Sequence, residues 1–139
     1  MEGGGAAHAT LTLPHALRQR CRQRVRLDNG EEAGLYLPRG SRLRDGDRLL
    51  STDGLVVEVR AARETVSRVS CADALALAGL CYHLGNRHVE IQLGRGWVAY
   101  LRDPVLDGMV RGLGFEVDVA QQPFEPLPGA YHAGGTVHA

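Results

Sequence analysis

The chain has 139 residues, 44% of them hydrophobic, which is enough for one ordinary domain or two small ones with a modest core. Its 16 basic and 16 acidic residues balance, which argues against a strongly basic surface that would attract nucleic acid or anionic membranes. The sequence contains no apolar run of roughly 18 residues, as a membrane span needs, and no signal-peptide pattern at its start. We therefore expect a soluble cytoplasmic protein with no nucleic-acid or membrane partner.

The three cysteines, Cys21, Cys71 and Cys81, are odd in number and widely spaced. This pattern argues against a disulfide framework and against a thiolate zinc site. We expect reduced and mostly buried thiols, although Cys81 lies close to His83 in the sequence.

The first half of the chain has the pattern of a small β domain. Residues 1–9 are mostly glycine and alanine and are expected to form a disordered N-terminus. Short apolar runs then alternate with turn signals such as Asp28-Asn29-Gly30, as in successive β-hairpins. The sequence therefore predicts an all-β domain over residues 10–64. Its turns at Arg39-Gly40 and Asp45-Gly46-Asp47 are equally consistent with ordinary loop chemistry and with a partner-docking edge.

The pattern changes after residue 64. Val66–Val69 is expected to be a strand, and the stretch Ser70-Cys71-Ala72-Asp73 resembles a capping box that begins a helix. That helix is predicted from about Cys71 to Leu84, because its alanines and leucines favour helix. Gly85 is well placed to end it in a left-handed conformation.

After this break the sequence predicts two strands, a second helix and a last strand. Alternation of Val89, Ile91 and Leu93 with polar residues has the period of a strand with one buried face. A Gly94-Arg95-Gly96 turn then leads to a returning strand at Trp97–Leu101. Asp103-Pro104 begins the second helix, which ends at Gly114 and has an apolar stripe made of Val105, Leu106, Met109, Val110 and Leu113. The last strand is predicted over Phe115–Val119.

The order β-α-β-β-α-β over residues 65–120 predicts a ferredoxin-like domain with both helices on one face of a four-stranded sheet. The expected fold class is therefore α+β, with the small all-β domain first and an irregular tail over residues 121–139 that carries His132 and His138. Parity along the predicted strand places His88, Glu90 and Gln92 on the uncovered sheet face.

His83 and His88, which lie five residues apart across Gly85-Asn86, are not equivalent. For His83, in the last helical turn, we expect a packing or capping role. His88 is either a solvated surface histidine or a metal ligand, and one imidazole cannot hold a divalent ion. An uncovered sheet face invites a twofold dimer, in which a residue near the axis meets its own copy. Two copies of His88, with His132 or His138, would form an exposed site suited to loading and releasing a metal.

Several motifs in order resemble one known family, the urease accessory nickel metallochaperones of the UreE type. The likeness runs from about Leu13 to His132 and is carried by LPRGSRLRDGDRLLSTDG, YHLGNRH, RDPVLDGMVRGLGFEV and PFEPLPGAYH. It implies an N-terminal domain that binds partner proteins or peptides and a C-terminal domain that dimerises around a nickel ion. The implied interface ligand is the histidine of Gly-Asn-Arg-His, here His88. His83 matches a histidine that is not the usual interface ligand.

Two departures from the family pattern limit the expected metal sites. Arg102-Asp103-Pro104 has no imidazole where some members carry an extra histidine, so a secondary site is not expected. The tail has only His132 and His138, so it is not expected to be a large metal reservoir. The predicted metal residues are therefore His88, His132 and His138, holding Ni²⁺, with Zn²⁺ or Cu²⁺ able to compete in vitro.

The resemblance implies a homodimeric nickel carrier, not an enzyme, that serves the urease apoprotein complex together with the urease accessory GTPase. The alternative is a metal-independent protein- or RNA-binding module on the ferredoxin-like sheet, although RNA reading would need exposed aromatic residues among basic ones. A hydrolase is the weakest hypothesis, because the sequence has no Gly-x-Ser-x-Gly, His-Glu-x-x-His or P-loop motif.

Overall fold

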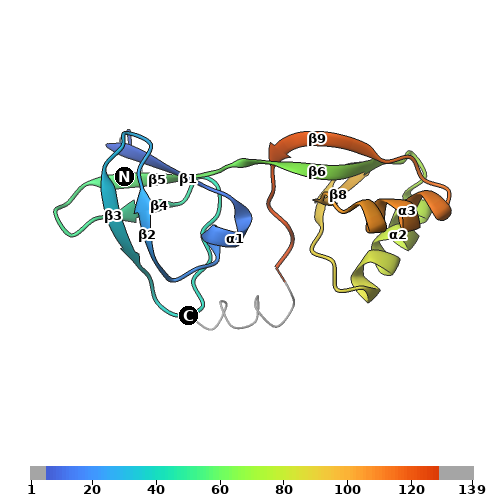
Figure 1. Cartoon of the computed structure of the whole chain (residues 1–139), viewed down its shortest axis with the longest axis horizontal. Coiled ribbons are helices and arrows are strands. Elements are labelled where there is room, and N and C mark those ends of the chain that lie inside the picture. The colour runs from blue at the N-terminus through green and yellow to red at the C-terminus, as the bar shows by residue number, and fades with distance from the viewer. Residues whose placement is uncertain (1–5, 129–139) are drawn as a thin grey trace. The chain divides into compact units, whose positions relative to one another are not determined.

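The computed structural model describes residues 6–128, which divide into two compact units (Figure 1). One unit ends at Ala62 and the other spans Arg63–Pro128. Each unit has its own hydrophobic core. Within the described range, none of the helices has the length and apolar character needed to cross a membrane.

The N-terminal unit consists of a three-stranded sheet, a β-hairpin and a single-turn helix. Strand β1 (Ala9–Leu13) runs parallel to β5 (Val56–Ala61), which pairs antiparallel with β4 (Arg48–Leu50). Strands β2 (Arg22–Arg26) and β3 (Glu32–Tyr36) form the antiparallel hairpin, and helix α1 (His15–Arg18) follows β1. The expected small sheet domain is confirmed. Strand β1 and helix α1 were not predicted.

Alternation along the strands decides which faces of this unit are buried. Leu11 and Leu13 of β1, Val59 of β5 and Leu35 of β3 point into one core and are at most 7% exposed. Arg18 of helix α1 is also buried, and its guanidinium donates to the carbonyl oxygens of Leu13, at 3.1 Å, and Leu43, at 3.5 Å. These bonds satisfy a charged group inside the unit and attach the loop after β3 to the helix.

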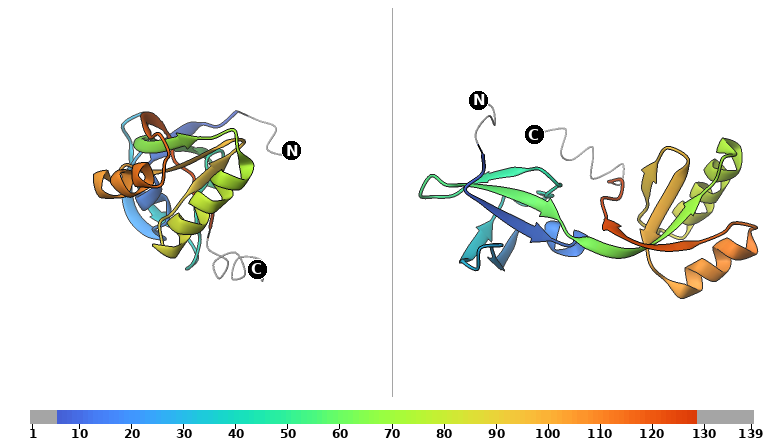
Figure 2. Two further views of the ribbon diagram at one scale, coloured as in Figure 1. Left: turned by 90° about the vertical axis from the view of Figure 1, so that its right-hand side faces the viewer. Right: turned by 90° about the horizontal axis from the view of Figure 1, so that it is seen from above.

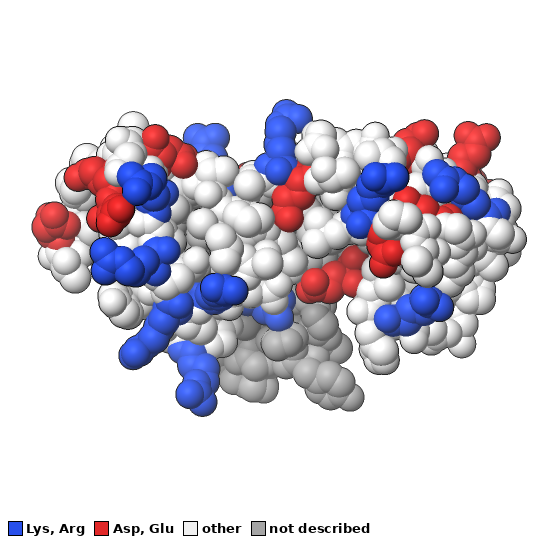
Figure 3. All heavy atoms as spheres, in the orientation of Figure 1, with Lys and Arg blue, Asp and Glu red and all other residues white. Residues whose placement is uncertain are grey.

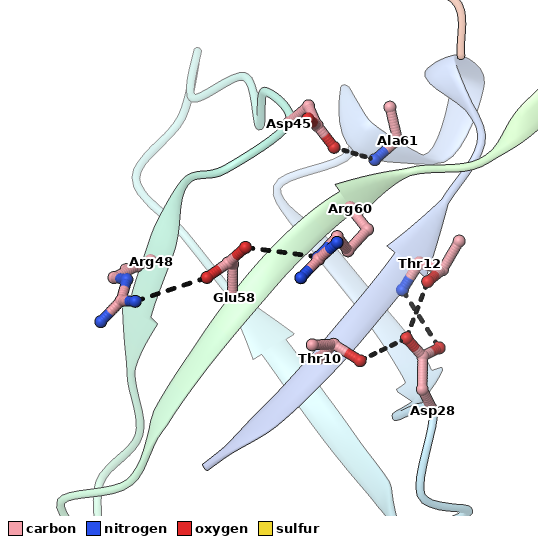
Figure 4. A network of polar contacts seen from close by, with 8 residues as sticks. All are labelled: Thr10, Thr12, Asp28, Asp45, Arg48, Glu58, Arg60 and Ala61. Carbon is pink, nitrogen blue, oxygen red and sulfur yellow. Dashed lines mark hydrogen bonds and ion pairs between the residues drawn. The ribbon is translucent and has the colours of Figure 1, made fainter. Parts of the chain in front are cut away.

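Asp28 joins the hairpin to the first sheet (Figure 4). Its carboxylate accepts hydrogen bonds from the hydroxyls of Thr10, at 2.6 Å, and Thr12, at 2.7 Å, and a longer one from the Thr12 backbone N–H. Burial acts to raise the pKa of Asp28, but these hydrogen bonds and the charge of Arg60 lower it by more. The carboxylate therefore stays ionised at neutral pH and clamps the hairpin turn to β1.

The Asp45-Gly46-Asp47 turn serves the local backbone. Asp45 accepts a hydrogen bond from the N–H of Ala61 at 2.8 Å (Figure 4), and Asp47 accepts one from the N–H of Arg44 at 2.8 Å. These bonds support the interpretation of the turn as ordinary loop chemistry.

The C-terminal unit has the predicted ferredoxin-like arrangement. Its four strands form an antiparallel sheet in the order β7-β8-β6-β9, and the helices α2 and α3 lie on the same face (Figures 1 and 2). The elements are β6 (Arg63–Ser70), α2 (Ala74–Asn86), β7 (Gln92–Gly94), β8 (Trp97–Leu101), α3 (Pro104–Gly112) and β9 (Asp118–Pro123). Leu80 and Leu84 of α2 and Val110 of α3 pack against the sheet and are almost fully buried.

The strand expected to begin near His88 is shorter than predicted. Strand β7 starts only at Gln92, because the chain uses the residues after Asn86 to turn away from the end of the helix. Val89 and Ile91 still pack on the helix-side core, so their apolar alternation reflects burial without strand pairing. The placement of His88 on a strand of the uncovered sheet face is therefore wrong.

The helix starts test two capping predictions. The prediction that Ser70 caps α2 is wrong, because Ser70 remains in β6. Asp73 is the N-cap, and its carboxylate accepts hydrogen bonds from the N–H groups of Leu75 and Ala76. At α3 the prediction is confirmed, since Asp103 is the N-cap and a proline takes the first turn. The apolar stripe of α3 is narrower than expected, however, because Val105 is 76% exposed.

The second face of the sheet is partly covered by the chain itself. Strand β9 continues to Pro123, so the prediction of irregular structure from Gln121 is wrong for its first three residues. The next residue, Phe124, is fully buried against Val66 and Ala99 on the face opposite the helices. The sequence did not predict this cover.

A polar pair lies inside the helix-side core. The Tyr100 hydroxyl donates to Asp107 Oδ1 at 2.6 Å, and both side chains are at most 2% exposed. Burial and the neighbouring Asp107 carboxylate raise the pKa of Tyr100 above its ordinary range. Arg102 Nε lies 4.0 Å from the other oxygen of Asp107. This pair connects α3 to the central strand β8.

Candidate metal centre

His88 lies at the C-terminal end of helix α2, where it adopts a left-handed backbone conformation with φ of 59°. Within residues 6–128 it is the one non-glycine residue with a positive φ. The sequence analysis assigned this conformation to Gly85, but the helix continues through Gly85 and Asn86. The residue that ends the helix is therefore the predicted metal ligand itself.

The hydrogen bonds around His88 form a Schellman motif. The Val89 N–H donates to the Leu84 carbonyl at 3.2 Å, and the His88 N–H donates to the Gly85 carbonyl at 3.0 Å. Val89 and Leu84 both pack in the core, as this motif usually requires. Packing on either side of His88 therefore holds its backbone in place.

Glycine normally occupies such a position, because the left-handed conformation costs other residues roughly 1–2 kcal/mol. Strained residues of this kind persist where the surrounding structure fixes them, and they concentrate at functional sites. The His88 side chain is exposed at the negative end of the helix dipole, which favours a cation. These features make His88 a candidate ligand for a metal ion.

The other groups on the same helix are less suited to metal binding. His83 is exposed and meets the Tyr82 ring edge-on, with 5.6 Å between ring centroids, so the expected packing role is wrong. Its position in the last turn still suits a favourable interaction with the helix dipole. Cys81 packs against the core, and burial raises the pKa of its thiol, which disfavours the thiolate that a metal needs.

The described part of one chain does not bring the predicted ligands together. Between residues 6 and 128, no group of three or more His, Cys, Asp or Glu side chains is arranged to hold a metal ion. His132 and His138 lie outside the described residues.

Residues 124–128, here called the strap, carry the chain toward the His88 loop. After the buried Phe124, the Glu125 N–H donates to the Gln92 side chain at 3.3 Å. The Leu127 N–H then donates to the Ile91 carbonyl at 2.8 Å. The strap thus crosses from β9, at one edge of the sheet, to the start of β7 at the other. Ile91 is only three residues after His88.

The alternative of an RNA-reading sheet finds little support on the face opposite the helices. Phe124 is buried there, and the Trp97 ring is covered by Arg68, whose Cζ lies 4.0 Å from the ring centroid. Tyr100 lies on the other face, in the helix-side core. Exposed rings for base stacking are therefore not presented by these three residues.

Two features of the site were missed by sequence reasoning. The pair Leu84 and Val89, five residues apart around Arg87-His88, is the hydrophobic contact of a Schellman motif and would have located the left-handed residue at His88. Phe124, the first large apolar residue after β9, would have indicated an anchored segment in place of a tail that begins at Gln121.

The structure is that of an α+β chain of two small units, with an exposed imidazole in a left-handed conformation at a helix end as its candidate metal ligand. Two family models match it: "UreE urease accessory protein, N-terminal domain" over residues 2–62, and "UreE urease accessory protein, C-terminal domain" over residues 64–139. The chain belongs to the UreE urease accessory protein family, a family of accessory proteins and not of enzymes. The resemblance inferred from the motifs is thereby confirmed.

Relatives named "Urease accessory protein UreE" match most of the chain. The protein of Alkalilimnicola ehrlichii is 59% identical over 125 residues, which cover 90% of this chain and 77% of the relative. That of Citrobacter koseri is 53% identical over 132 residues, covering 94% and 87%. That of Proteus mirabilis is 52% identical over 122 residues, covering 88% and 76%.

Proposed function

We propose that this protein is a cytoplasmic nickel metallochaperone that delivers Ni²⁺ to apo-urease and holds the ion between the His88 side chains of two copies. The observation that carries the proposal is His88 itself, exposed and held left-handed at the end of α2. A position that favours glycine but holds histidine is explained by a need for the imidazole. Nickel is the cargo here, and ligand exchange is the only chemistry required.

A second copy of the chain would supply the ligands that one His88 lacks. Borderline divalent ions need several nitrogen or oxygen donors, and a twofold axis near His88 brings two imidazoles together. The outer face of α2, which leads to His88, supports such a dimer. Leu75 and Tyr82, two helical turns apart on that face, are 82% and 66% exposed. Exposed apolar side chains on one helix face are typical of an interface.

The tail histidines are proposed as additional ligands. Leu127 is held beside Ile91, and His132 follows it by five residues. An extended chain of that length spans up to about 17 Å, enough to return to a residue three positions before Ile91. His138 has a longer reach. The strap therefore starts the tail within range of His88 in the same chain.

The donor set does not select nickel by affinity alone. Imidazole suits zinc, copper and nickel, and copper would bind most tightly by the usual order. Zn²⁺ and Cu²⁺ are therefore expected to compete in vitro, and specificity in the cell would come from metal availability and from partners. Family membership supports the urease accessory GTPase and the urease apoprotein complex as those partners.

Calorimetric titration of Ni²⁺, combined with analytical sedimentation, tests this proposal. We expect a stoichiometry of one ion for two chains and a dimer at saturation, because each copy contributes one His88 to a shared ion. Titrations with Zn²⁺ and Cu²⁺ should show the same stoichiometry. A strictly monomeric protein when saturated with nickel would contradict the shared site.

The strap gives a second prediction, concerning the tail. Replacing Leu127 with proline removes the N–H that donates to Ile91 while leaving the buried Phe124 in place. Released from β7, the tail loses part of its effective concentration at the ion, so nickel affinity should fall by about threefold to tenfold. The measurement is calorimetric titration of Ni²⁺.

Leu127→Ala is the matched control, since it shortens the same side chain but keeps the N–H donor. It should bind nickel as the unmodified chain does. A protein truncated after Pro128 marks the affinity without any tail. Equal nickel affinity of this truncated protein and the full chain would remove His132 and His138 from the proposed site.

A further inference from the structure

The outer face of the β2–β3 hairpin is rich in arginine. Successive side chains of β2 alternate between the core and solvent, and all three residues on the solvent side are arginines. In the hairpin register, Arg22 pairs with Tyr36, Arg24 with Gly34 and Arg26 with Glu32. The arginine face is defined here as Arg22, Arg24, Arg26 and Tyr36, all of them exposed.

The zero net charge of the chain conceals a difference between its two units. All 16 basic residues are arginines. Residues 6–62 carry ten of them against seven carboxylates, whereas residues 63–128 carry six against eight. Figure 3 shows basic side chains gathered along one side of the N-terminal unit. The arginine face belongs to the basic unit.

A carboxylate of the chain already occupies part of this face. Glu32 places Oε2 at 2.9 Å from Arg26 and Oε1 at 3.6 Å from Arg24. One carboxylate thus bridges two arginines that are two residues apart. The side chains of Arg24 and Glu32 are 80% and 57% exposed, so solvent and salt screen the pair and it is easily exchanged.

Tyr36 adds an aromatic surface beside the arginines. It is 71% exposed, and the Arg22 guanidinium carbon lies 5.8 Å from its ring centroid. A Cβ at Gly34 would lie 2.7 Å from Tyr36 Cε2, so the ring lies over the glycine. Arginine and tyrosine are enriched where protein interfaces gain most of their binding energy.

We propose that the arginine face docks an extended acidic segment of a partner protein with a carboxylate at every second residue. Alternate residues of such a strand lie about 6.6–6.8 Å apart, the same repeat as Arg22, Arg24 and Arg26. Each guanidinium presents a planar fork that matches a carboxylate. This inference concerns the N-terminal unit and does not depend on the nickel site.

The observations favour a protein partner over nucleic acid. Glu32 bridges two arginines of the face and follows Glu31 in the sequence, and both carboxylates would repel a continuous row of phosphates. Glu32 also demonstrates that the arginine spacing accepts a carboxylate. The excess of three arginines in the described N-terminal unit is small for a surface that binds a polyanion without sequence preference.

Fluorescence anisotropy with labelled probes on the full-length protein tests the docking surface. The first probe is a peptide of about ten residues that alternates threonine and glutamate, and the second has the same composition with its glutamates contiguous. A uridine oligonucleotide of about 12 residues is the third. We expect the alternating peptide to bind best, and its binding to weaken between about 20 mM and about 500 mM salt.

Two substitutions should move the affinity in opposite directions. Arg24→Glu should weaken binding of the alternating peptide by at least about tenfold, because it places like charges together. Glu32→Gln should strengthen it about threefold, because it removes the competing internal carboxylate. Arg95→Glu, with the same charge change in the exposed turn before β8, is the control and should leave the affinity unchanged. Melting curves confirm that each variant is folded.

Several outcomes would overturn the inference. These are equal binding of the two peptides, preferential binding of the oligonucleotide, or no effect of Arg24→Glu. A change of sedimentation behaviour in Arg24→Glu would instead assign the face to contacts between copies of this chain. Nickel stoichiometry should be the same in all of these variants, so failure here and failure of the nickel site can be distinguished.

Discussion

Replacing His88 with glycine is expected to abolish the shared nickel site and to leave the protein at least as stable as the unmodified chain. The two effects have different origins. The first comes from the side chain, which is the proposed ligand. The second comes from the backbone, because glycine adopts the left-handed conformation at φ of 59° without the penalty that histidine bears there.

The size of each effect can be bounded. Relief of the left-handed strain contributes roughly 1–2 kcal/mol, and the extra flexibility of glycine in the unfolded chain offsets about 0.5–1 kcal/mol of it. The free energy of unfolding should therefore rise by about 0–1.5 kcal/mol. Loss of a residue that only hydrogen-bonds to a metal ligand typically weakens metal binding about 10–100-fold. Loss of one imidazole from each of two copies should cost at least about 100-fold.

Calorimetric titration and denaturant unfolding measure the two effects. His83→Gly is the matched control, because it removes a second exposed histidine from the same helix. It should keep the nickel site, yet lose stability, since glycine inside a helix costs about 0.5–1 kcal/mol. If His88→Gly bound nickel as tightly as the unmodified chain, His88 would not be a ligand. A clear loss of stability in His88→Gly would show that the strain argument is wrong.

Replacing Tyr100 with phenylalanine is expected to lower the free energy of unfolding of the C-terminal unit by about 2–4 kcal/mol. The change removes the hydroxyl that donates to Asp107 at 2.6 Å and leaves that carboxylate in a buried site. A hydrogen bond to a charged group contributes about 1.5–3 kcal/mol, and an unsatisfied buried partner adds to the cost. The contact with Arg102 at 4.0 Å is too long to replace it.

The single tryptophan, Trp97, lies in β8 and reports unfolding of this unit by fluorescence. Tyr82→Phe is the matched control, because Tyr82 is 66% exposed, so a change below about 0.5 kcal/mol is expected. The double variant Tyr100→Phe with Asp107→Leu should regain part of the loss, since removing both polar partners leaves no orphaned charge. Equal stability of Tyr100→Phe and Tyr82→Phe would contradict the proposed role of the pair.

The same pair predicts a pH dependence. The pKa of Tyr100 is raised in the folded protein, first by burial and then by Asp107, so the folded state holds this proton more tightly than the unfolded chain does. The resulting stability is fully present below about pH 10, the ordinary tyrosine pKa, and is lost as pH rises beyond it. Tyr100→Phe should lack this alkaline component when unfolding is measured across that range.

Much of the fold followed from patterns that are local in sequence. Asp103-Pro104 began α3 as predicted, and the Gly94-Arg95-Gly96 turn located the returning strand β8, because a cap or a turn depends on a few adjacent residues. The sequence order then sufficed for the ferredoxin-like unit. Membership of the family was also predictable, since several motifs occurred in the right order.

The errors arose where distant contacts decide the outcome. Val89 and Ile91 have strand alternation, but the packing of Val89 against Leu84 makes this stretch part of a helix end. Phe124 is buried only because Val66 and Ala99, far away in the sequence, present a matching surface. Neither contact can be inferred from local sequence patterns. The predicted strand therefore placed His88 wrongly on the sheet.

The strap has a consequence for the solubility of shortened forms of the protein. Strand β7 is an outer strand of its sheet, and the Leu127 N–H meets the backbone carbonyl at its start. An outer strand with unmatched carbonyl and amide groups is a template for pairing with other molecules. Cutting the chain before Phe124 would uncover both this template and the apolar surface of Val66 and Ala99, and so favour aggregation. The strap therefore also reduces pairing between the sheets of separate molecules.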